Sequence, residues 1–314
     1  MPGPYSSALS SRAIVGRFFQ RYEGILGGMW GSMLSFYNKS DQESETYKFL
    51  GLPPEMREWA GDRLEKSFNI YSQTISNKTY EFTLPIDVDD VRRDKTGQIL
   101  MRVGQTAQRA ASHWEKLLTD LINTNPTCYD GVAFFATTHV SGDSGTQEND
   151  LDSSDVGALN VTTAAAPTRD EAIDIIIGLA QYMYGYKDDK GVPMNGDAKE
   201  FAIMVPPKMI GAFKAATNVD LALAGARNIL SAQDFNVRAF ANPRLTASDN
   251  IVYFFRIDSE AKPFIMQEEL PLQAQLVGAG SEEEFKFNRW LFGGKAIRNV
   301  GPGLWQHAIK ATLS

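Results

Sequence analysis

The sequence TYKFLGLPPEMREWAGDR, residues 46–63, opens the stretch that decides the fold, and this stretch continues to His139. Pro53 and Pro54 stiffen a turn because the proline ring fixes one backbone angle. Charged side chains surround a single tryptophan, and Trp and Arg are the side chains that most often dominate protein interfaces. This segment is therefore a candidate contact surface, made of Glu55, Arg57, Glu58, Trp59, Asp62 and Arg63.

Two runs of strand-forming residues follow this segment. Residues 68–75 and 79–86 are rich in β-branched and aromatic residues, and the intervening Ser76, Asn77 and Lys78 favour a turn. The pattern predicts a long two-stranded arm. Since a lone hairpin is marginally stable in water, we expect this arm to lie on its own domain or on a neighbouring subunit.

A long amphipathic helix is predicted from Gly97 to about Ile122, where apolar residues recur at helical spacing. A helix of roughly 25 residues would be about 38 Å long, which is well above the usual length in globular proteins. The helix is expected to end at residues 123–126, NTNP. Residues 128–139, CYDGVAFFATTH, then predict a glycine-bearing turn that leads into an aromatic strand.

The order of these pieces resembles the family of Mu-like major head subunits, which are major capsid proteins of tailed phages with the Hong Kong 97-like fold. The resemblance is specific over residues 45–140 and is weaker but continuous over the rest. It is carried by FLG at 49–51, REW at 57–59, GDR at 61–63, NKTYE at 77–81, Asp89 and Asp90, YDG at 129–131, Phe134 and Phe135, and Thr138 and His139.

The resemblance implies an α+β fold in four parts. Residues 1–44 would form an N-terminal arm, and residues 45–95 an extended β-hairpin loop, the E-loop. Residues 96–165 and 281–314 would form a peripheral domain with a spine helix at 97–122, because in this family the C-terminal tail returns to the spine. Residues 166–280 would form an axial α+β domain.

Local patterns outside the resemblance add further expectations. The apolar helix within residues 1–44 is weakened by glycines and should be held by packing on a partner. Residues 142–168 are poor in hydrophobic residues and predict an exposed loop. Thr168 and Glu171 form a capping-box pattern at the start of a helix. Further elements are expected as strands at 201–205, 235–240, 251–257, 285–292, 295–300 and 305–313, with a helix at 209–216.

Composition agrees with a large shell subunit. The chain has 314 residues, 43% hydrophobic and 22% charged, so it can bury a substantial core, and its net charge of -7 makes it a poor nucleic-acid binder by bulk electrostatics. The single cysteine, Cys128, excludes an internal disulfide framework and fits a reducing cytosol. No secretory signal pattern precedes the chain's first helix, and no run reaches 18 uninterrupted apolar residues, so no membrane segment is expected.

Candidate chemical groups do not converge on a catalytic pattern. His113, His139 and His307 lack metal-ligand spacing, and the pair Cys128 and His139 matches no nucleophile signature. Asp87, Asp89, Asp90 and Asp94 are interspersed with Arg92, Arg93 and Lys95, which favours ion pairing over a cation site. The glycine-rich residues 24–31 follow no strand and lack the lysine of a phosphate-binding loop. No catalytic residue, metal or cofactor is therefore predicted.

The resemblance implies a structural protein whose hexamers and pentamers build an icosahedral shell around double-stranded DNA. The arm would reach over an adjacent subunit, where Arg57, Trp59 and Arg63 would meet acidic groups, and Lys78 near the arm tip is the position to test for a covalent crosslink. Scaffold, portal and decoration proteins are candidate partners, and contact with packaged DNA is expected to be non-specific.

The expected location is the virion capsid, after assembly in the host cytoplasm. Two alternatives stay open. One is a cellular compartment shell of the same fold that encloses an enzyme, and the other is a soluble α+β enzyme with a site in the second domain.

Overall fold

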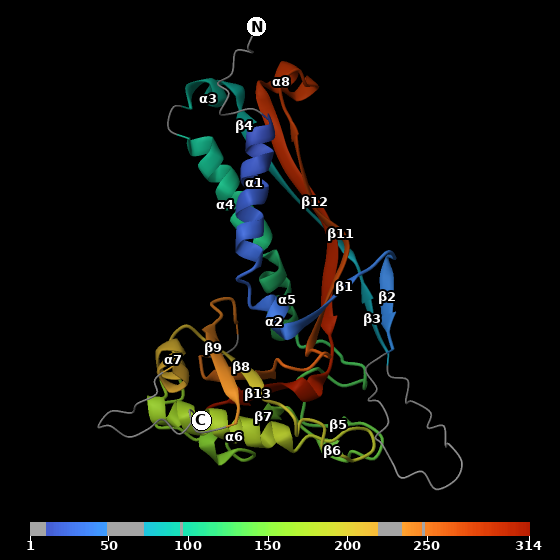
Figure 1. Cartoon of the computed structure of the whole chain (residues 1–314), viewed down its shortest axis with the longest axis vertical. Coiled ribbons are helices and arrows are strands. Elements are labelled where there is room, and N and C mark those ends of the chain that lie inside the picture. The colour runs from blue at the N-terminus through green and yellow to red at the C-terminus, as the bar shows by residue number, and fades with distance from the viewer. Residues whose placement is uncertain (1–10, 49–71, 95–96, 219–233, 247–248) are drawn as a thin grey trace.

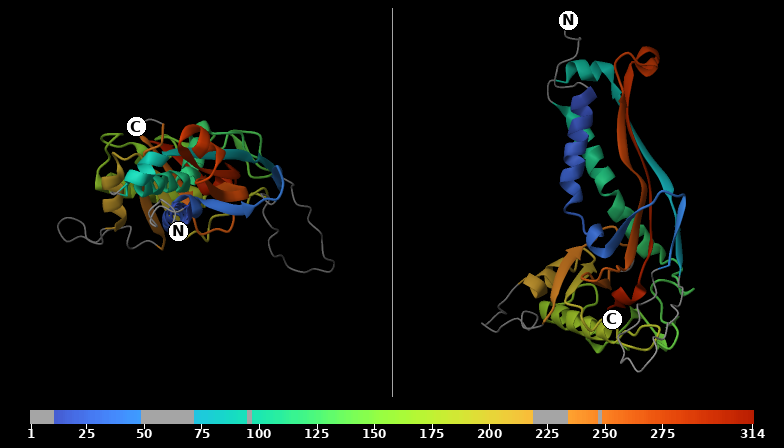
Figure 2. Two further views of the ribbon diagram at one scale, coloured as in Figure 1. Left: turned by 90° about the horizontal axis from the view of Figure 1, so that it is seen from above. Right: turned by 45° about the vertical axis from the view of Figure 1, so that its right-hand side comes forward.

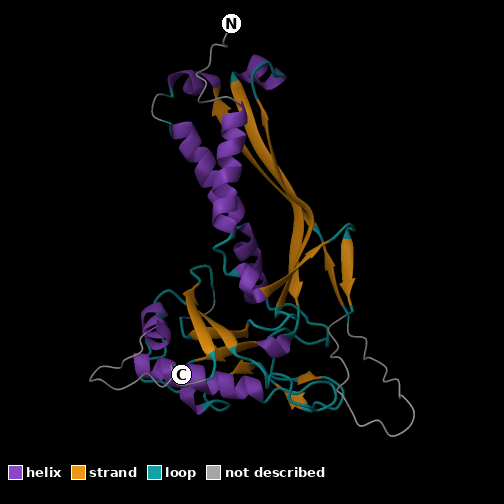
Figure 3. Cartoon of the chain, in the orientation of Figure 1, coloured by secondary structure: helices purple, strands orange, loops and turns teal. Residues whose placement is uncertain are grey.

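The structure is a computed structural model that describes residues 11–48, 72–94, 97–218, 234–246 and 249–314. The molecule has two parts, a tall upper part of long strands and helices and a compact lower part (Figure 1). Helices and strands are mixed in both parts, which confirms the α+β class (Figure 3). None of the helices in the described ranges combines the length and the apolar character that a membrane span requires.

The upper part is a four-stranded sheet covered on one face by two helices (Figures 1 and 2). Its strand order is β1-β11-β12-β4, with β1 parallel to β11 and the other neighbours antiparallel. The strands are β1 Ser35–Lys39, β11 Phe264–Val277, β12 Arg289–Pro302 and β4 Lys78–Asp87, and the helices are α1 Ser11–Leu26 and α4 Gln98–Ala111. The short helices α3 Val88–Arg93 and α8 Glu282–Phe287 lie at the far end.

The core of the upper part is a continuous apolar layer between these helices and the sheet. From α1, the side chains of Ile14 and Phe18 are fully buried one turn apart. They meet α4, which buries Val103 and Ala107 at the same spacing, and the ring of Phe18 lies 5.2 Å from that of Phe292 on β12. The expectation that the N-terminal helix needs a partner subunit is therefore wrong, because its apolar face packs on α4 and the sheet of the same chain.

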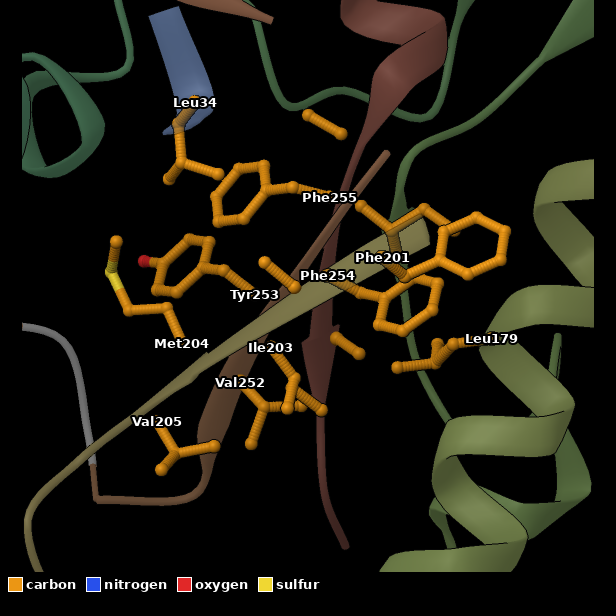
Figure 4. Packing of buried hydrophobic residues seen from close by; sticks show 14 of the residues in the cluster. Leu34, Leu179, Phe201, Ile203, Met204, Val205, Val252, Tyr253, Phe254 and Phe255 are labelled. Atoms are coloured by element: carbon orange, nitrogen blue, oxygen red, sulfur yellow. The ribbon is translucent and has the colours of Figure 1, made fainter. Parts of the chain in front are cut away.

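The lower part is a five-stranded sheet of order β7-β13-β10-β8-β9 between two layers. Leu34 and Leu179 lie on opposite sides of this sheet, and the ring of Phe201 stacks 5.0 Å from that of Phe254 (Figure 4). Its strands are β7 Asp150–Leu151, β13 Ala308–Thr312, β10 Ile251–Arg256, β8 Glu200–Val205 and β9 Asn236–Ala241, and its helices are α6 Arg169–Tyr184, α7 Ile210–Asn218, α5 His113–Thr124 and α2 Gly31–Leu34.

The remaining elements are short. The strands β2 Ser44–Tyr47 and β3 Gln73–Ser76 form a separate two-stranded sheet, as do β5 His139–Val140 and β6 Thr146–Gln147. The 3-10 turns are η2 Gly157–Leu159 and η4 Trp305–His307. The predicted capping box at Thr168 and Glu171 is confirmed, with both reciprocal hydrogen bonds present at the start of α6.

The prediction of a two-stranded arm is wrong in its strand pairing. β3 and β4 follow one another but do not pair, because Asn77 separates two strands that belong to different sheets. β3 pairs with β2, and β4 pairs along its whole length with β12. The strand predicted at 79–86 is confirmed, whereas the strand predicted at 68–75 is confirmed only at 73–75, because residues 68–71 lie outside the described residues. The alternation of β4 reflects a face that packs on the helix layer, where the ring of Phe82 lies 5.5 Å from that of Phe18 on α1.

The predicted spine helix is two helices. α4 ends at Ala111, Ser112 has φ -68° and ψ 3°, and α5 starts at His113. The physical reason is that the apolar stripe serves two cores, since Val103 on α4 packs in the upper part and Leu118 on α5 packs in the lower part. The predicted end at residues 123–126 is confirmed, with Asn125 in the left-handed conformation after Thr124.

The segment 142–168 is not simply an exposed loop. Ser144, Asn149, Leu151 and Leu159 are buried in it, and β7 adds to the five-stranded sheet. Side-chain amides replace hydrophobic contacts here, so hydropathy underestimates its order. The aromatic strand predicted before it is also wrong, because Phe134 and Phe135 fill the core from a loop and only His139 and Val140 form strand β5.

The C-terminal quarter differs from the prediction in three ways. Residues 285–287 belong to α8, which starts at the N-cap Ser281. Residues 289–302 form one strand, without the expected turn at Gly293 and Gly294. Gly294 instead permits close packing, because a β-carbon there would lie 2.5 Å from the ring of Phe82. β13 lies in the lower sheet and does not return to the spine, whereas β11, placed by prediction in the axial domain, lies in the upper sheet.

A glycine substitution tests the packing of the 142–168 segment. A β-carbon at Gly178 on α6 would lie 2.8 Å from Val156 Cγ1, whereas one at Gly104 on α4 meets nothing within 4 Å. Gly178→Ala should lower the free energy of unfolding by about 1 kcal/mol, since overpacking outweighs the gain in helix propensity. Gly104→Ala, the matched control, should raise it by about 0.5–1 kcal/mol. Equal effects in urea unfolding would show that the segment does not press on α6.

Candidate assembly interface

The structure describes one of the seven residues predicted at the interface, Lys78. The other six, Glu55, Arg57, Glu58, Trp59, Asp62 and Arg63, lie outside the described residues. The described part instead shows the base from which the segment 49–71 departs. This base, which we call the platform, consists of β2 and β3 with the turn at Asn77.

The platform is fixed to the upper sheet by one fully buried amide, Gln267 on β11. Its Oε1 accepts a hydrogen bond of 2.8 Å from the Tyr47 hydroxyl. Its Nε2 donates to the Ile75 carbonyl at 3.2 Å and to Asn77 Oδ1 at 2.9 Å. Because all three contacts reach β2, β3 or the turn, this residue holds the platform on the sheet.

Close packing reinforces this polar attachment. Tyr47, Ile75 and Ile265 form a small buried cluster between the platform and β11. A β-carbon at Gly301 on β12 would lie 2.4 Å from Ile75 Cδ1, so only glycine fits beneath β3. Sequence reasoning missed Gln267 and Gly301, because an isolated Gln and Gly in a strand carry no interface signal.

Lys78 is not near the tip of an arm, contrary to the prediction. It is the first residue of β4, stands opposite Arg298 of β12 in the strand register, and is exposed. Arg298 is buried, lies 3.8 Å from Glu268 and stacks 4.7 Å from the ring of Trp114. Lys78 therefore sits at the foot of the platform, beside a buried ion pair.

The three histidines pack against other side chains or backbone in the lower part and where the upper and lower parts meet. His139 is buried, its Nδ1 lies 2.5 Å from Asp130 Oδ2, and its ring stacks 4.0 Å from that of Trp305. Its Nε2 lies 3.1 Å from Asn149 Oδ1, which also accepts the Ala136 N–H. Since Asn149 Nδ2 donates to backbone carbonyls, this Oδ1 is an acceptor and His139 Nε2 carries a proton.

The other titratable candidates are held in inert forms. Burial raises the pKa of the Cys128 thiol, so it stays protonated, and its Sγ lies 3.7 Å from the Gly303 carbonyl. Burial and the charge of Arg298 lower the pKa of His113 to about 4. Burial and the charge of Arg256 lower the pKa of His307 to about 4, and its Nδ1 donates to the Ala261 carbonyl. Neither histidine is a base that carries a proton near neutral pH.

Two of the four aspartates at 87–94, Asp87 and Asp94, cap helices. Asp87 accepts the Asp89 N–H at 2.7 Å at the start of α3, and Asp94 accepts the N–H groups of Gln98 and Ile99 at the start of α4. Asp89 lies 3.6 Å from Arg92, an ion pair of the expected kind. In the ranges covered by the structure, no three His, Cys, Asp or Glu side chains gather as a metal would require.

A cavity lies beside the spine, and its one carboxylate, Glu81, accepts a hydrogen bond of 3.1 Å from the Thr83 hydroxyl. The cavity measures about 380 Å³ between β4 and α4 and is lined by Tyr80, Phe82, Arg109, His113 and Arg298 among others. His113 is neutral there and its ring packs 4.4 Å from that of Tyr80.

A tall sheet with a helix layer, a compact second sheet and a platform for a long segment together define a Hong Kong 97-like shell protein. The chain matches the family model of the Mu-like prophage major head subunit gpT over residues 18–165 and 230–314, which is more than half of its length. It belongs to this family. The family consists of structural head proteins, so the alternative of an enzyme is set aside.

Individual relatives agree with this placement. The chain is 34% identical over 113 residues to the major capsid protein of Escherichia phage Mu, and 28% identical over 132 residues to a Mu-like prophage major head subunit of Haemophilus influenzae. These alignments cover 33% and 41% of the chain, and 37% and 43% of the relatives.

Among solved structures, the procapsid of bacteriophage JBD30 is similar in fold. Its TM-score is 0.55 at 19% identity, and the match covers 98% of this chain and 76% of that one.

The platform makes a testable contribution to stability. Gln267→Leu should lower the free energy of unfolding by about 2–4 kcal/mol, because it removes three hydrogen bonds, which reach the Tyr47 hydroxyl, the Ile75 carbonyl and the Asn77 side chain. Gln273→Leu is the matched control, since Gln273 is an exposed residue of the same strand, and it should change stability by less than about 0.5 kcal/mol. Similar values for both variants in urea unfolding would show that Gln267 does not anchor the platform.

His307 predicts a pH dependence of stability. Its pKa falls from 6.5 in the unfolded chain to about 4 in the folded protein, so the unfolded chain binds more protons between these values. The stabilisation is therefore complete above pH 6.5 and is lost as the pH falls toward 4, by about 3 kcal/mol in total. His307→Gln should remove this component, so the difference in unfolding free energy between the two proteins should shrink from pH 7 to pH 4.5. A difference that stays constant over this range would contradict the assignment.

Proposed function

We propose that this protein is the major shell subunit of a phage or prophage head, and that many copies assemble into an icosahedral shell around double-stranded DNA. The observation that carries the proposal is the family match, which extends over both the upper and the lower part. The fold supports it, because Gln267 fixes the platform, whose strands β2 and β3 flank the segment 49–71 in the sequence, to the upper sheet.

Assembly is the mechanism in this proposal. Closed shells require heterologous contacts whose geometry closes, and hexamers and pentamers use the same surfaces in slightly different settings. The platform suits this task, because Gln267 and the packing of Ile75 hold it in a constant direction on the upper sheet. We expect Arg57, Trp59 and Arg63 to contact acidic groups of an adjacent copy.

The same proposal covers partners and location. Scaffold, portal and decoration proteins would join the shell during assembly in the host cytoplasm, and the finished protein would be part of the virion. The family match favours a head over a compartment shell that encloses an enzyme. Neighbouring genes for a portal and a terminase would support the head, and a neighbouring cargo enzyme without them would support the compartment.

Lys78 is the remaining candidate for a covalent bond between copies. Its position at the foot of the platform, opposite Arg298 of the same chain, argues against such a bond. Assembled material boiled in denaturant is therefore expected to run as a single 34.7 kDa band on a denaturing gel.

The contact segment has a direct test. Expressed alone, the wild-type chain should form uniform shells or capsomers in negative-stain electron microscopy. Trp59→Ala with Arg63→Ala should abolish them, because both anchors of the interface are lost, while circular dichroism should show an unchanged fold. Lys208→Ala with Lys214→Ala is a control, since both are exposed residues of the lower part, and it should assemble normally. Normal particles from the Trp59 and Arg63 variant would refute the role of this segment.

A further inference from the structure

The helix layer of the upper part carries an excess of positive charge that the whole chain does not have. The chain has a net charge of -7, yet α1 and α4 together hold five arginines and one carboxylate, Glu23. All five guanidinium-bearing side chains are exposed. We call this surface the arginine layer, and it consists of Arg12, Arg17, Arg21, Arg102 and Arg109.

These arginines have no acidic partners in the described part of the chain. The arginines that form ion pairs there lie elsewhere, on α3, α6 and strands β9, β10 and β12 and in the loop after β9. Arg17 donates to the amide of Gln20 at 3.2 Å, a neutral partner that leaves its charge uncompensated. Neighbouring charges cancel locally, as Arg92 pairs with Asp89 and Lys116 with Asp120. The arginine layer therefore keeps a net charge of its own.

Apart from Glu23 and Met101, the rest of the layer's exposed surface is polar and uncharged. Gln20, Gln98, Gln105 and Gln108 stand between the arginines, and Met101 is the one large hydrophobic side chain of these two helices that is markedly exposed. Protein interfaces centre on buried aromatic or aliphatic anchors, which this surface lacks. Interfaces with nucleic acid are polar and strongly positive, and phosphate is bound by Arg and amide side chains.

The geometry suits a long, uniformly charged partner. α1 and α4 pack side by side along the upper part (Figure 2). Along the axis of α1, Arg12 lies about 14 Å from Arg21, and along the axis of α4, Arg102 lies about 10 Å from Arg109. A DNA duplex carries about one negative charge per 1.7 Å of its axis, so a duplex beside the layer presents phosphates to the arginines that face it in any register.

We infer that the arginine layer binds the phosphate backbone of double-stranded DNA without sequence preference, and that it faces the interior of the shell. This inference rests on the proposed function, because the shell encloses the DNA. It also identifies which side of the subunit points inward. The negative total charge of the chain limits the attraction, so contacts at each subunit remain few and salt-sensitive.

The test is salt-titrated binding of a short mixed-sequence DNA duplex to the full-length chain below its assembly concentration. Each phosphate contact contributes about 0.9 to the slope of log K against log salt. A variant with all five arginines changed to Gln should lose about 0.9 in this slope for each arginine that contacts a phosphate, and about 4.5 at most. A variant with the same five changed to Lys should keep the wild-type slope, which separates loss of charge from loss of folding.

A matched control removes the same charge from the lower part. It carries the exposed or half-exposed Lys187, Lys190, Lys199, Lys208 and Lys214 changed to Gln, and it should keep the wild-type slope. If the five-arginine variant binds DNA with the wild-type slope, or if the wild type binds no duplex at low salt, the inference is wrong. A wild type that binds no duplex at low salt would instead favour an acidic protein as the partner of the arginine layer.

Closed shells test the orientation. Duplex added outside should bind closed shells far more weakly than free subunits, since the layer would face inward, and equal binding per subunit would place it outside. Failure to form shells would count against the proposed function, whereas the titration on free subunits would still decide the DNA contact.

Discussion

The structure depends on the path of its last two strands, β12 and β13, which lie in different sheets and so connect both parts of the molecule. β12 lies between β11 and β4 in the upper sheet, and after a single 3-10 turn β13 lies between β7 and β10 in the lower sheet. Both strands are hydrogen-bonded along two edges. The C-terminal segment therefore joins the two cores through backbone pairing as well as through the covalent chain, and neither sheet is complete without it.

The turn between these strands is a polar centre in an apolar core. Trp305, Gln306 and His307 are buried, and two buried amides hold the turn in place. Asn149 Nδ2 donates to the Ala308 carbonyl at 3.1 Å, and Asn195 Nδ2 donates to the Gln306 carbonyl at 3.0 Å. These bonds satisfy backbone groups that would otherwise be costly to bury. They also explain why residues 142–168 are ordered with so few hydrophobic side chains.

This construction fits the task of a shell subunit. Two cores joined through paired strands give a stiff body, and Gln267 holds the platform on this body. Charge is also distributed unevenly over this body. Carboxylates outnumber basic groups in the whole chain, but they are sparse on α1 and α4. One subunit can thus join neighbours at one surface and present a different chemistry at another.

Much of this follows from the sequence alone, because it depends on local patterns. The family motifs at residues 45–140, the capping box at Thr168, the end of the spine near Asn125 and the strands β8, β9, β10 and β13 are set by side-chain spacing and turn chemistry that act over a few residues. The interface predicted at Trp59 and Arg63 also comes from local composition and remains a prediction.

Only the tertiary structure decided which strands pair, where the spine divides and where the charge gathers. β4 pairs with β12 more than 200 residues away, Ser112 splits the spine because two cores compete for one apolar stripe, and Gly294 and Gly301 are required by Phe82 and Ile75 on other strands. These are contacts between distant segments. Their energies depend on partners that no window of the sequence contains.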